Sequence, residues 1–237
     1  MSKEFAVVIS PHIDDAVISL GGILQGYDNV LVLNVFDQSR ETITGTRPEE
    51  VTKQRRNEDE KISQLYNFKF NYASLPDTSL RGVNWNDYKA PIDYALLSKT
   101  QNWIKSQLDV LSVNFNVFIP ASYGLHPDHY LTTIAFSTEP LLSYLNRVPF
   151  AVYCDQPYYL DNKLVLYKHC GHEYLNEAGS LTVVPFSSEE KRKMLFVYQS
   201  QLSEDRINFL AKKNTNEFYW QTDPQFFIKS LIRNKND

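Results

Sequence analysis

Residues 5–15 read FAVVISPHIDD, an apolar, β-branched run that passes directly into a histidine and two carboxylates. A run this short, bounded by a serine and a proline, is typical of a buried strand. A second apolar run, residues 117–120, precedes the segment HPDH at residues 126–129. Metal-ligating and acid-base side chains that follow two separate strands predict an α/β protein whose site lies at the carboxyl ends of a parallel sheet.

The rest of the chain alternates between the same two patterns. Further apolar runs lie at residues 30–36, 68–75 and 150–154. Helical patterning fills the segments between the runs, at residues 15–25, 48–66, 91–111 and 127–145. Three of these four segments open with a proline, which suits the first turn of a helix. We therefore predict a mostly parallel sheet flanked by crossover helices, in a single domain over residues 1–237.

After residue 154 the pattern changes. We expect short extended pieces at residues 164–169 and 181–185, and a charged helix from Ser188 to about Ser203. The aromatic residues at 218–220 and 226–227 are expected to pack against the sheet. The long segments 37–47 and 76–90 follow strands, and we expect them to wall a pocket.

Composition narrows the class of partner. The net charge is −4, and the only run of basic residues is Lys191-Arg192-Lys193, which argues against a nucleic-acid-binding surface. The N-terminus lacks a signal-peptide pattern, and we predict no transmembrane segment. We expect a cytoplasmic protein that acts on a small molecule, and a homo-oligomer is compatible with the sequence.

The two histidine clusters together contain the ligands of a catalytic metal site. Catalytic zinc commonly takes three protein ligands from His and Asp or Glu, and leaves a fourth position for water or substrate. His12, Asp15 and His129 would supply such a set. Two imidazoles and one carboxylate also suit Fe²⁺ or another divalent metal, so zinc is our preferred cofactor rather than the only one.

The remaining members of the clusters are candidates for proton transfer. Asp14 lies at a strand-to-helix turn, so its carboxylate would point away from that of Asp15 and could act as the general base for a water. Pro127 predicts a helix whose first turn contains Asp128 and His129, with His126 just before it. We expect Asp128 to hold His126 as an imidazolium that stabilises an oxyanion or protonates a leaving amine.

These motifs resemble those of a known family. The segment PHIDDA at residues 11–16 with Gly21-Gly22, and HPDH at residues 126–129, are similar to the PIG-L/LmbE-like zinc-dependent N-acetylglucosaminyl deacetylases. The segment RRNE at residues 55–58 and the stretch from Lys191 to Gln201 also resemble that family. The resemblance extends over about residues 5–202, although Ile13 stands where the family usually has proline.

The resemblance implies a Rossmann-like fold and hydrolysis of the acetamido group of an N-acetyl amino sugar or glycoconjugate. It implies the same roles for the ligand set, for the base Asp14, and for the pair formed by His126 and Asp128. By motif position it also implies Arg56, Asp77 and Tyr123 as substrate-binding residues. Arg81 and Trp85 lie in the same long segment as Asp77.

Two alternatives are compatible with the same residues. A metal-dependent hydrolase of another acyl amide or of an ester would need the same site, because the pocket walls alone select the substrate. A noncatalytic sugar- or nucleotide-binding protein on a Rossmann-like frame is the other alternative. The presence of Asp14 argues against it, as does the absence of a glycine-rich turn after the first apolar run.

Overall fold

The computed structural model describes residues 5–87, 89–111, 114–122, 126–157, 179–213, 216–225 and 227–228. Five parallel strands form most of one mixed sheet: β1 (Phe5–Ser10), β2 (Asn29–Asn34), β3 (Phe68–Tyr72), β4 (Phe115–Pro120) and β5 (Phe150–Tyr153). The antiparallel strands β6 (Gly179–Pro185) and β7 (Asn216–Thr222) complete it, in the order β3-β2-β1-β4-β5-β7-β6. The predicted α/β class with a mostly parallel sheet is confirmed, and the aromatic segment 218–220 lies within the sheet as part of β7.

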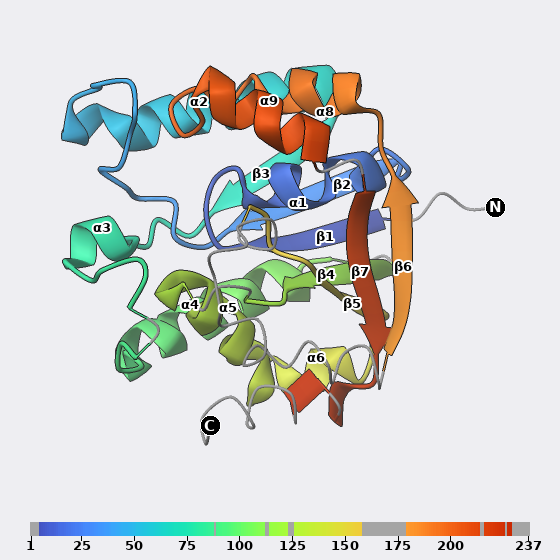
Figure 1. Cartoon of the computed structure of the whole chain (residues 1–237). Coiled ribbons are helices and arrows are strands. Elements are labelled where there is room, and N and C mark those ends of the chain that lie inside the picture. The colour runs from blue at the N-terminus through green and yellow to red at the C-terminus, as the bar shows by residue number, and fades with distance from the viewer. Residues whose placement is uncertain are drawn as a thin grey trace.

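Helices cover both faces of the sheet (Figure 1). One face is covered by α1 (Asp15–Leu24), α2 (Pro48–Tyr66), α8 (Ser188–Leu195) and α9 (Glu204–Lys213), and the other by α4 (Tyr94–Asp109), α5 (Pro127–Ile134) and α6 (Leu142–Leu145). Because side chains alternate along a strand, Val7 and Ile9 of β1 enter one core cluster while Ala6 and Val8 enter the other. Two separate apolar layers thus hold the strand ends in place.

Two predicted helices differ from the structure. The segment 127–145 is not one helix but α5, a 3-10 turn (Ala135–Ser137) and the short α6, because Pro140 has no amide hydrogen to continue a helix. The charged helix ends at Leu195 rather than near Ser203, and a second helix, α9, follows it. The predicted piece 164–169 lies outside the described residues.

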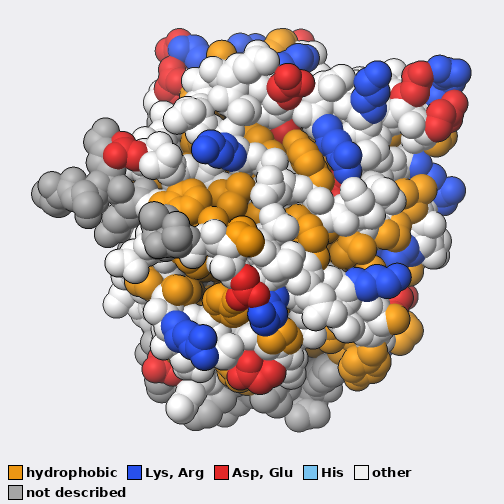
Figure 2. Space-filling model, turned by 180° about the vertical axis from the view of Figure 1, so that it is seen from behind, with side chains coloured by type: hydrophobic (Ala, Val, Ile, Leu, Met, Phe, Trp, Pro, Cys, Tyr) orange, Lys and Arg blue, Asp and Glu red, His pale blue; other side chains and the backbone are white. Residues whose placement is uncertain are grey.

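The described helices and the face in Figure 2 bear on the membrane and nucleic-acid classes of partner. Among the described residues, no helix combines the length and apolar character that a membrane span requires. Figure 2 shows Lys and Arg side chains scattered over one face, often next to Asp or Glu. The described part of that face therefore presents no concentrated basic surface of the kind that binds nucleic acid.

The glycine pair in α1 lets other elements approach the helix closely. A Cβ on Gly22 would lie 2.5 Å from ring atoms of Phe186, whereas a Cβ on Gly21 would meet the flexible end of Met194 at 2.9 Å. Alanine at either position stabilises the helix by about 1 kcal/mol through its higher helix propensity. Of the two substitutions, Gly22→Ala forces a rigid ring to move, which costs about 1–3 kcal/mol. We expect a lower urea midpoint for Gly22→Ala than for Gly21→Ala. Equal midpoints would contradict this account.

Asp59 is buried and links α2 to β2, to β3 and to the segment that follows α8. Its carboxylate accepts hydrogen bonds from Asn34 Nδ2 at 2.7 Å, Tyr72 OH at 3.2 Å and Tyr198 OH at 2.8 Å. Burial outweighs these bonds and raises the pKa of Asp59 to about 7. The folded protein therefore holds the Asp59 proton more tightly than the unfolded chain does.

A raised carboxyl pKa makes stability fall as the pH rises. The contribution of Asp59 is greatest below pH 4, declines between about pH 4 and pH 7, and is constant above that range. The full change is at most about 4 kcal/mol, from 1.36 kcal/mol per pKa unit. In Asp59→Asn we expect the free energy of unfolding to lose this part of its pH dependence. Urea titrations of both proteins between pH 4 and pH 8 measure it, and parallel curves would contradict the assignment.

Candidate active site

The two histidine clusters meet because their strands are neighbours. β1 pairs with β4 in parallel, so the segments that follow both strands emerge at the same edge of the sheet. His12 follows β1 and Asp128 lies in the first turn of α5 after β4, and His12 Nε2 is 2.9 Å from Asp128 Oδ2. Pro127 occupies the start of α5 and His126 caps it, as predicted.

The turn after β1 fixes the orientation of its two carboxylates. Asp14 has a φ of 121°, a conformation that a residue with a side chain rarely adopts and that commonly marks a functional site. The next residue, Asp15, begins α1, and its Oδ2 accepts the backbone N–H of His12 at 2.9 Å. Asp14 thus lies in a strained turn and Asp15 in the first turn of the helix, and both line the same cavity.

Two imidazoles converge on one oxygen of Asp15. His12 Nδ1 lies 3.2 Å and His129 Nε2 3.1 Å from Asp15 Oδ2. Within this trio, one ligand atom from each residue lies within 4.8 Å of the others. Two nitrogens and a carboxylate oxygen, all largely buried, are the donor types of a catalytic divalent-metal site, so the residues present fit such an ion. His12, His126 and Asp128 form a second group within the same distance.

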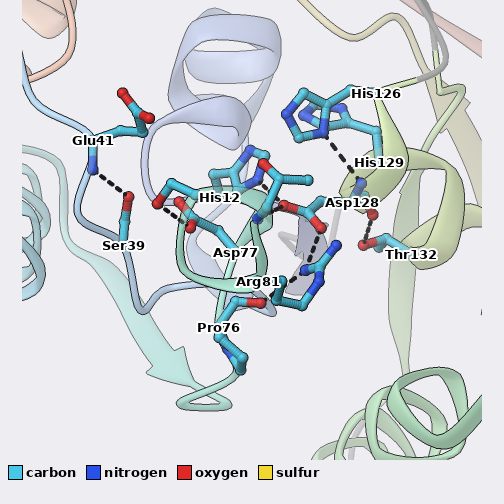
Figure 3. A network of polar contacts seen from close by, with 12 residues as sticks. His12, Ser39, Glu41, Pro76, Asp77, Arg81, His126, Asp128, His129 and Thr132 are labelled. Carbon is cyan, nitrogen blue, oxygen red and sulfur yellow. Dashed lines mark hydrogen bonds and ion pairs between the residues drawn. The ribbon is translucent and has the colours of Figure 1, made fainter. Parts of the chain in front are cut away.

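Both imidazoles of the trio have a carboxylate on their other nitrogen. Asp128 accepts from His12 Nε2, and also from the backbone N–H of Thr78 at 2.9 Å and from Arg81 Nη1 at 2.7 Å (Figure 3). Asp155, which follows β5, lies with its Oδ2 3.2 Å from His129 Nδ1. Such outer carboxylates fix the tautomer and the ring orientation of metal-ligating histidines.

His126 differs from the prediction. Its Nδ1 accepts the backbone N–H of Asp128 at 3.2 Å, whereas the carboxylate of Asp128 bonds His12, Thr78 and Arg81. Since a backbone N–H only donates, Nδ1 of His126 carries no proton and the hydrogen of the neutral ring lies on Nε2. Burial, followed by the charges of His12 and His129, lowers the pKa of His126 well below its usual value. The hydrogen bond to Nδ1 and the lowered pKa thus both indicate that His126 is a neutral imidazole rather than an imidazolium.

The pKa values of the other groups follow from burial and from one another. Burial alone lowers the pKa of His12 and of His129, but hydrogen bonds and charges of the neighbouring carboxylates raise them to about 10 and about 9. Burial raises the pKa of Asp15, and the two imidazoles lower it. The imidazoles have the larger effect, so the pKa of Asp15 lies below its usual value. Burial and the charge of Asp15 raise the pKa of Asp14 well above its usual value.

A cavity of about 580 Å³ opens above these groups. Its lining includes His12, Asp14, Asp15 and His126, together with Arg40 and Glu41 from one long segment and Asp77 to Ser79 and Gly82 to Trp85 from the other. The prediction that both segments wall a pocket is therefore confirmed. The carboxylate of Glu58 accepts hydrogen bonds from the backbone N–H and the hydroxyl of Ser200, and the Ser200 carbonyl accepts the N–H of Ile43. The next two residues, Gln201 and Leu202, also line the cavity.

The three predicted substrate-binding residues lie in different places relative to the cavity. Asp77 lines the cavity and its Oδ1 caps the short helix α3 (Thr78–Arg81). Arg56 is ion-paired with Asp37 and its guanidinium stacks 4.6 Å from the ring centre of Tyr72, while its neighbour Arg55 lines the cavity. Tyr123 lies outside the described residues. Trp85 is 56% exposed at the cavity wall.

Sequence reasoning missed Arg55 and Asp155. The buried residues of α2 include Val51, Arg55, Glu58 and Ile62, which share one helical face, and this spacing could have distinguished Arg55 from Arg56. Asp155 directly follows a predicted strand, and its position at the same sheet edge was the available signal.

Comparisons with known proteins place these observations in context. The family model described as GlcNAc-PI de-N-acetylase (PIG-L) matches residues 7–138, more than half of the chain. A search of curated proteins gave no match.

Solved structures share the fold at low sequence identity. Teicoplanin deacetylase Orf2 in its zinc-inhibited form is 22% identical, with a TM-score of 0.65 over 91% of this chain and 97% of that chain. The pseudoaglycone deacetylase Dbv21 is 22% identical, with a TM-score of 0.62 over 93% and 97%. The N,N'-diacetylchitobiose deacetylase of Pyrococcus horikoshii is 19% identical, with a TM-score of 0.58 over 95% and 86%.

Proposed function

The chain belongs to the PIG-L family of GlcNAc-PI de-N-acetylases, and from that premise we propose that it hydrolyses the acetamide of an N-acetylated amino sugar, releasing acetate and a free amine. The observation that carries the proposal is the convergence of His12, Asp15 and the buried His129 next to a cavity that is lined by His12, Asp14, Asp15 and His126. The three neighbours described above are named as deacetylases of teicoplanin, of the A40926 pseudoaglycone and of N,N'-diacetylchitobiose, which supports an N-acetylated sugar conjugate as the substrate class.

In this proposal His12, Asp15 and His129 hold a divalent metal, with zinc preferred. When bound, such an ion lowers the pKa of a water and polarises the amide carbonyl. The outer carboxylates Asp128 and Asp155 keep the two imidazoles oriented toward the ion.

The remaining residues transfer protons and bind charge. Asp14 accepts a proton from the attacking water, and its raised pKa suits a group that must then deliver the same proton to the amine nitrogen as the C–N bond breaks. His126 donates a hydrogen bond from Nε2 toward the developing oxyanion, because its Nδ1 accepts the N–H of Asp128 and carries no proton. One proton leaves the water and one reaches the amine, so the cycle returns Asp14 to its starting form.

The direct test is acetate release from a panel of N-acetylglucosamine conjugates by protein loaded separately with Zn²⁺ and with Fe²⁺. We expect turnover with at least one metal, its loss on chelation and its return on reloading. Metal-loaded protein that releases acetate from no conjugate, yet cleaves other acyl amides or esters, would favour the alternative hydrolase. Failure to bind any divalent metal would favour the noncatalytic alternative.

Arg55 is the proposed substrate contact on α2. It is buried, its Nη2 donates to the carbonyl of Glu41, and its Nε has no hydrogen-bond partner within the described part of the chain. A buried cationic donor at a cavity wall suits a sugar hydroxyl or carbonyl, an interaction of about 1.5–3 kcal/mol.

Variants at the two adjacent arginines distinguish the structural assignment from the sequence prediction. We expect Arg55→Met to lower kcat/KM by about 10- to 100-fold, mainly through KM. Arg56→Met is expected to change kcat/KM much less, because its guanidinium faces Asp37 and Tyr72. Steady-state kinetics of both variants measures the difference. A larger loss of kcat/KM in Arg56→Met than in Arg55→Met would instead assign the substrate contact to Arg56.

A further inference from the structure

Asp155 joins two elements that carry the site. Its side chain is fully buried just beyond β5, where its Oδ2 meets His129 Nδ1 at 3.2 Å. Its other oxygen, Oδ1, accepts the backbone N–H of Ala121, at the end of β4, at 3.0 Å. One carboxylate therefore contacts both the backbone before the HPDH segment and the imidazole within it.

The contact with Ala121 gives the carboxylate a fixed orientation. The Ala121 N–H is shared with the carbonyl of Tyr153 at 2.9 Å, so this amide points at two oxygens held by the end of β5. With Oδ1 kept there, Oδ2 faces the imidazole. An oxygen without a hydrogen can only accept, so the Asp155 contact places a proton on His129 Nδ1, and a metal bound at Nε2 would take the lone pair of that nitrogen. It is Nε2 that points to Asp15 Oδ2, at 3.1 Å.

We propose that Asp155 is a positioning residue that holds His129 in the one tautomer whose Nε2 can bind a divalent metal. The inference rests on the proposed metal site. It concerns a residue that lies outside the family-matched segment 7–138.

The orientation predicts an unusual order of effects for two substitutions. In Asp155→Asn the amide oxygen is expected to stay on the Ala121 N–H, because the reverse placement sets two N–H groups against each other about 3.0 Å apart. The amide NH₂ then donates to His129 Nδ1, which moves the ring proton to Nε2 and blocks the ligand atom. Asp155→Ala removes the acceptor without imposing the wrong tautomer.

We therefore expect metal affinity to fall in the order wild type, Asp155→Ala, Asp155→Asn. Loss of an outer partner of a metal-ligating histidine commonly weakens binding by about 10- to 100-fold. We expect Asp155→Ala within this range and Asp155→Asn at or beyond its upper end. A purely space-filling or structural role predicts the reverse order, because asparagine matches the shape of aspartate and alanine does not.

The experiment measures the Zn²⁺ affinity of the full chain by competition with a chromophoric chelator, with urea unfolding recorded for each variant. Asp109→Asn, which neutralises a half-exposed carboxylate on α4, is the matched control and should keep wild-type affinity. In parallel, ¹⁵N NMR of the zinc-loaded wild-type protein reports directly which nitrogen of His129 keeps its proton, and this measurement stands even if a variant fails to fold.

The outcomes are separable from those of the proposed function. Wild-type affinity in Asp155→Asn, an affinity in Asp155→Ala below that in Asp155→Asn, or a His129 proton on Nε2 rather than Nδ1 in the zinc-loaded protein would each overturn the positioning role, whatever the acetate assay shows. Tight zinc binding with the expected order, but no acetate release from any conjugate, would leave the positioning role in place and reject the deacetylase.

Discussion

Asp14→Asn is expected to lower acetate release by about 10²- to 10⁴-fold while the protein still binds its metal. General-base catalysis by a positioned side chain contributes a factor of this size, and asparagine keeps the shape of aspartate but cannot accept a proton. Asp14 is not one of the three residues that converge as ligands, so the metal content should not change. The effect should appear in kcat, since the proton moves in the transition state.

The measurement combines steady-state acetate release with metal analysis of the same samples. His129→Ala is the informative comparison, because it removes a ligand and should lose activity together with metal. An Asp14→Asn protein that retains more than a tenth of wild-type kcat would contradict the assignment of Asp14 as the base. Loss of metal in Asp14→Asn would instead place its carboxylate among the ligands.

Lys191→Met is expected to destabilise the fold by about 3–5 kcal/mol. Lys191 of α8 and Glu217 of β7 form an ion pair that is fully buried, and Lys191 Nζ also bonds the carbonyl of Ile18 at 2.5 Å. Glu217 in turn accepts the amides of Gly22 at 3.1 Å and Ile23 at 2.8 Å. Removing the lysine leaves a buried carboxylate without its cation, which is the costly way to break such a pair.

Urea unfolding of Lys191→Met and of Lys193→Met tests this expectation. Lys193 lies two residues away, is 55% exposed, and pairs with Glu189 and Glu190 at the surface. The same substitution there should leave the unfolding midpoint close to that of the wild type, because exposed ion pairs contribute little. Similar midpoints for the two variants would show that the buried pair does not anchor α1, α8 and β7 together.

The parallel strands and the convergence of His12, Asp15 and His129 could be predicted because both follow from local sequence. Short apolar runs define the strands, and the side chains after β1 and β4 must meet once those strands are neighbours. Pro127 likewise defines the start of α5. These features depend on residues close together in the chain and on one topological rule.

The partners of the site histidines could not be predicted in the same way. Asp128 lies two residues after His126 in the motif, yet its carboxylate reaches His12 and Arg81, because the first turn of α5 directs it across the sheet edge toward α3. The choice between Arg55 and Arg56 depends on the rotational phase of α2, which the packing of Val51 and Ile62 decides. Such details arise from packing between distant segments.

The contact between Glu58 and Ser200 joins the two parts of the chain that build the cavity. The ligand trio, Asp14 and His126 all lie within the family-matched segment, whereas Gln201 and Leu202 close the wall from beyond it. Part of the cavity wall is thus encoded in a different stretch of the gene from the residues of the proposed reaction chemistry. A protein organised this way can change that part of the wall without changing His12, Asp15 or His129, whereas a change at Asp155 is expected to weaken metal binding if the proposed positioning role holds.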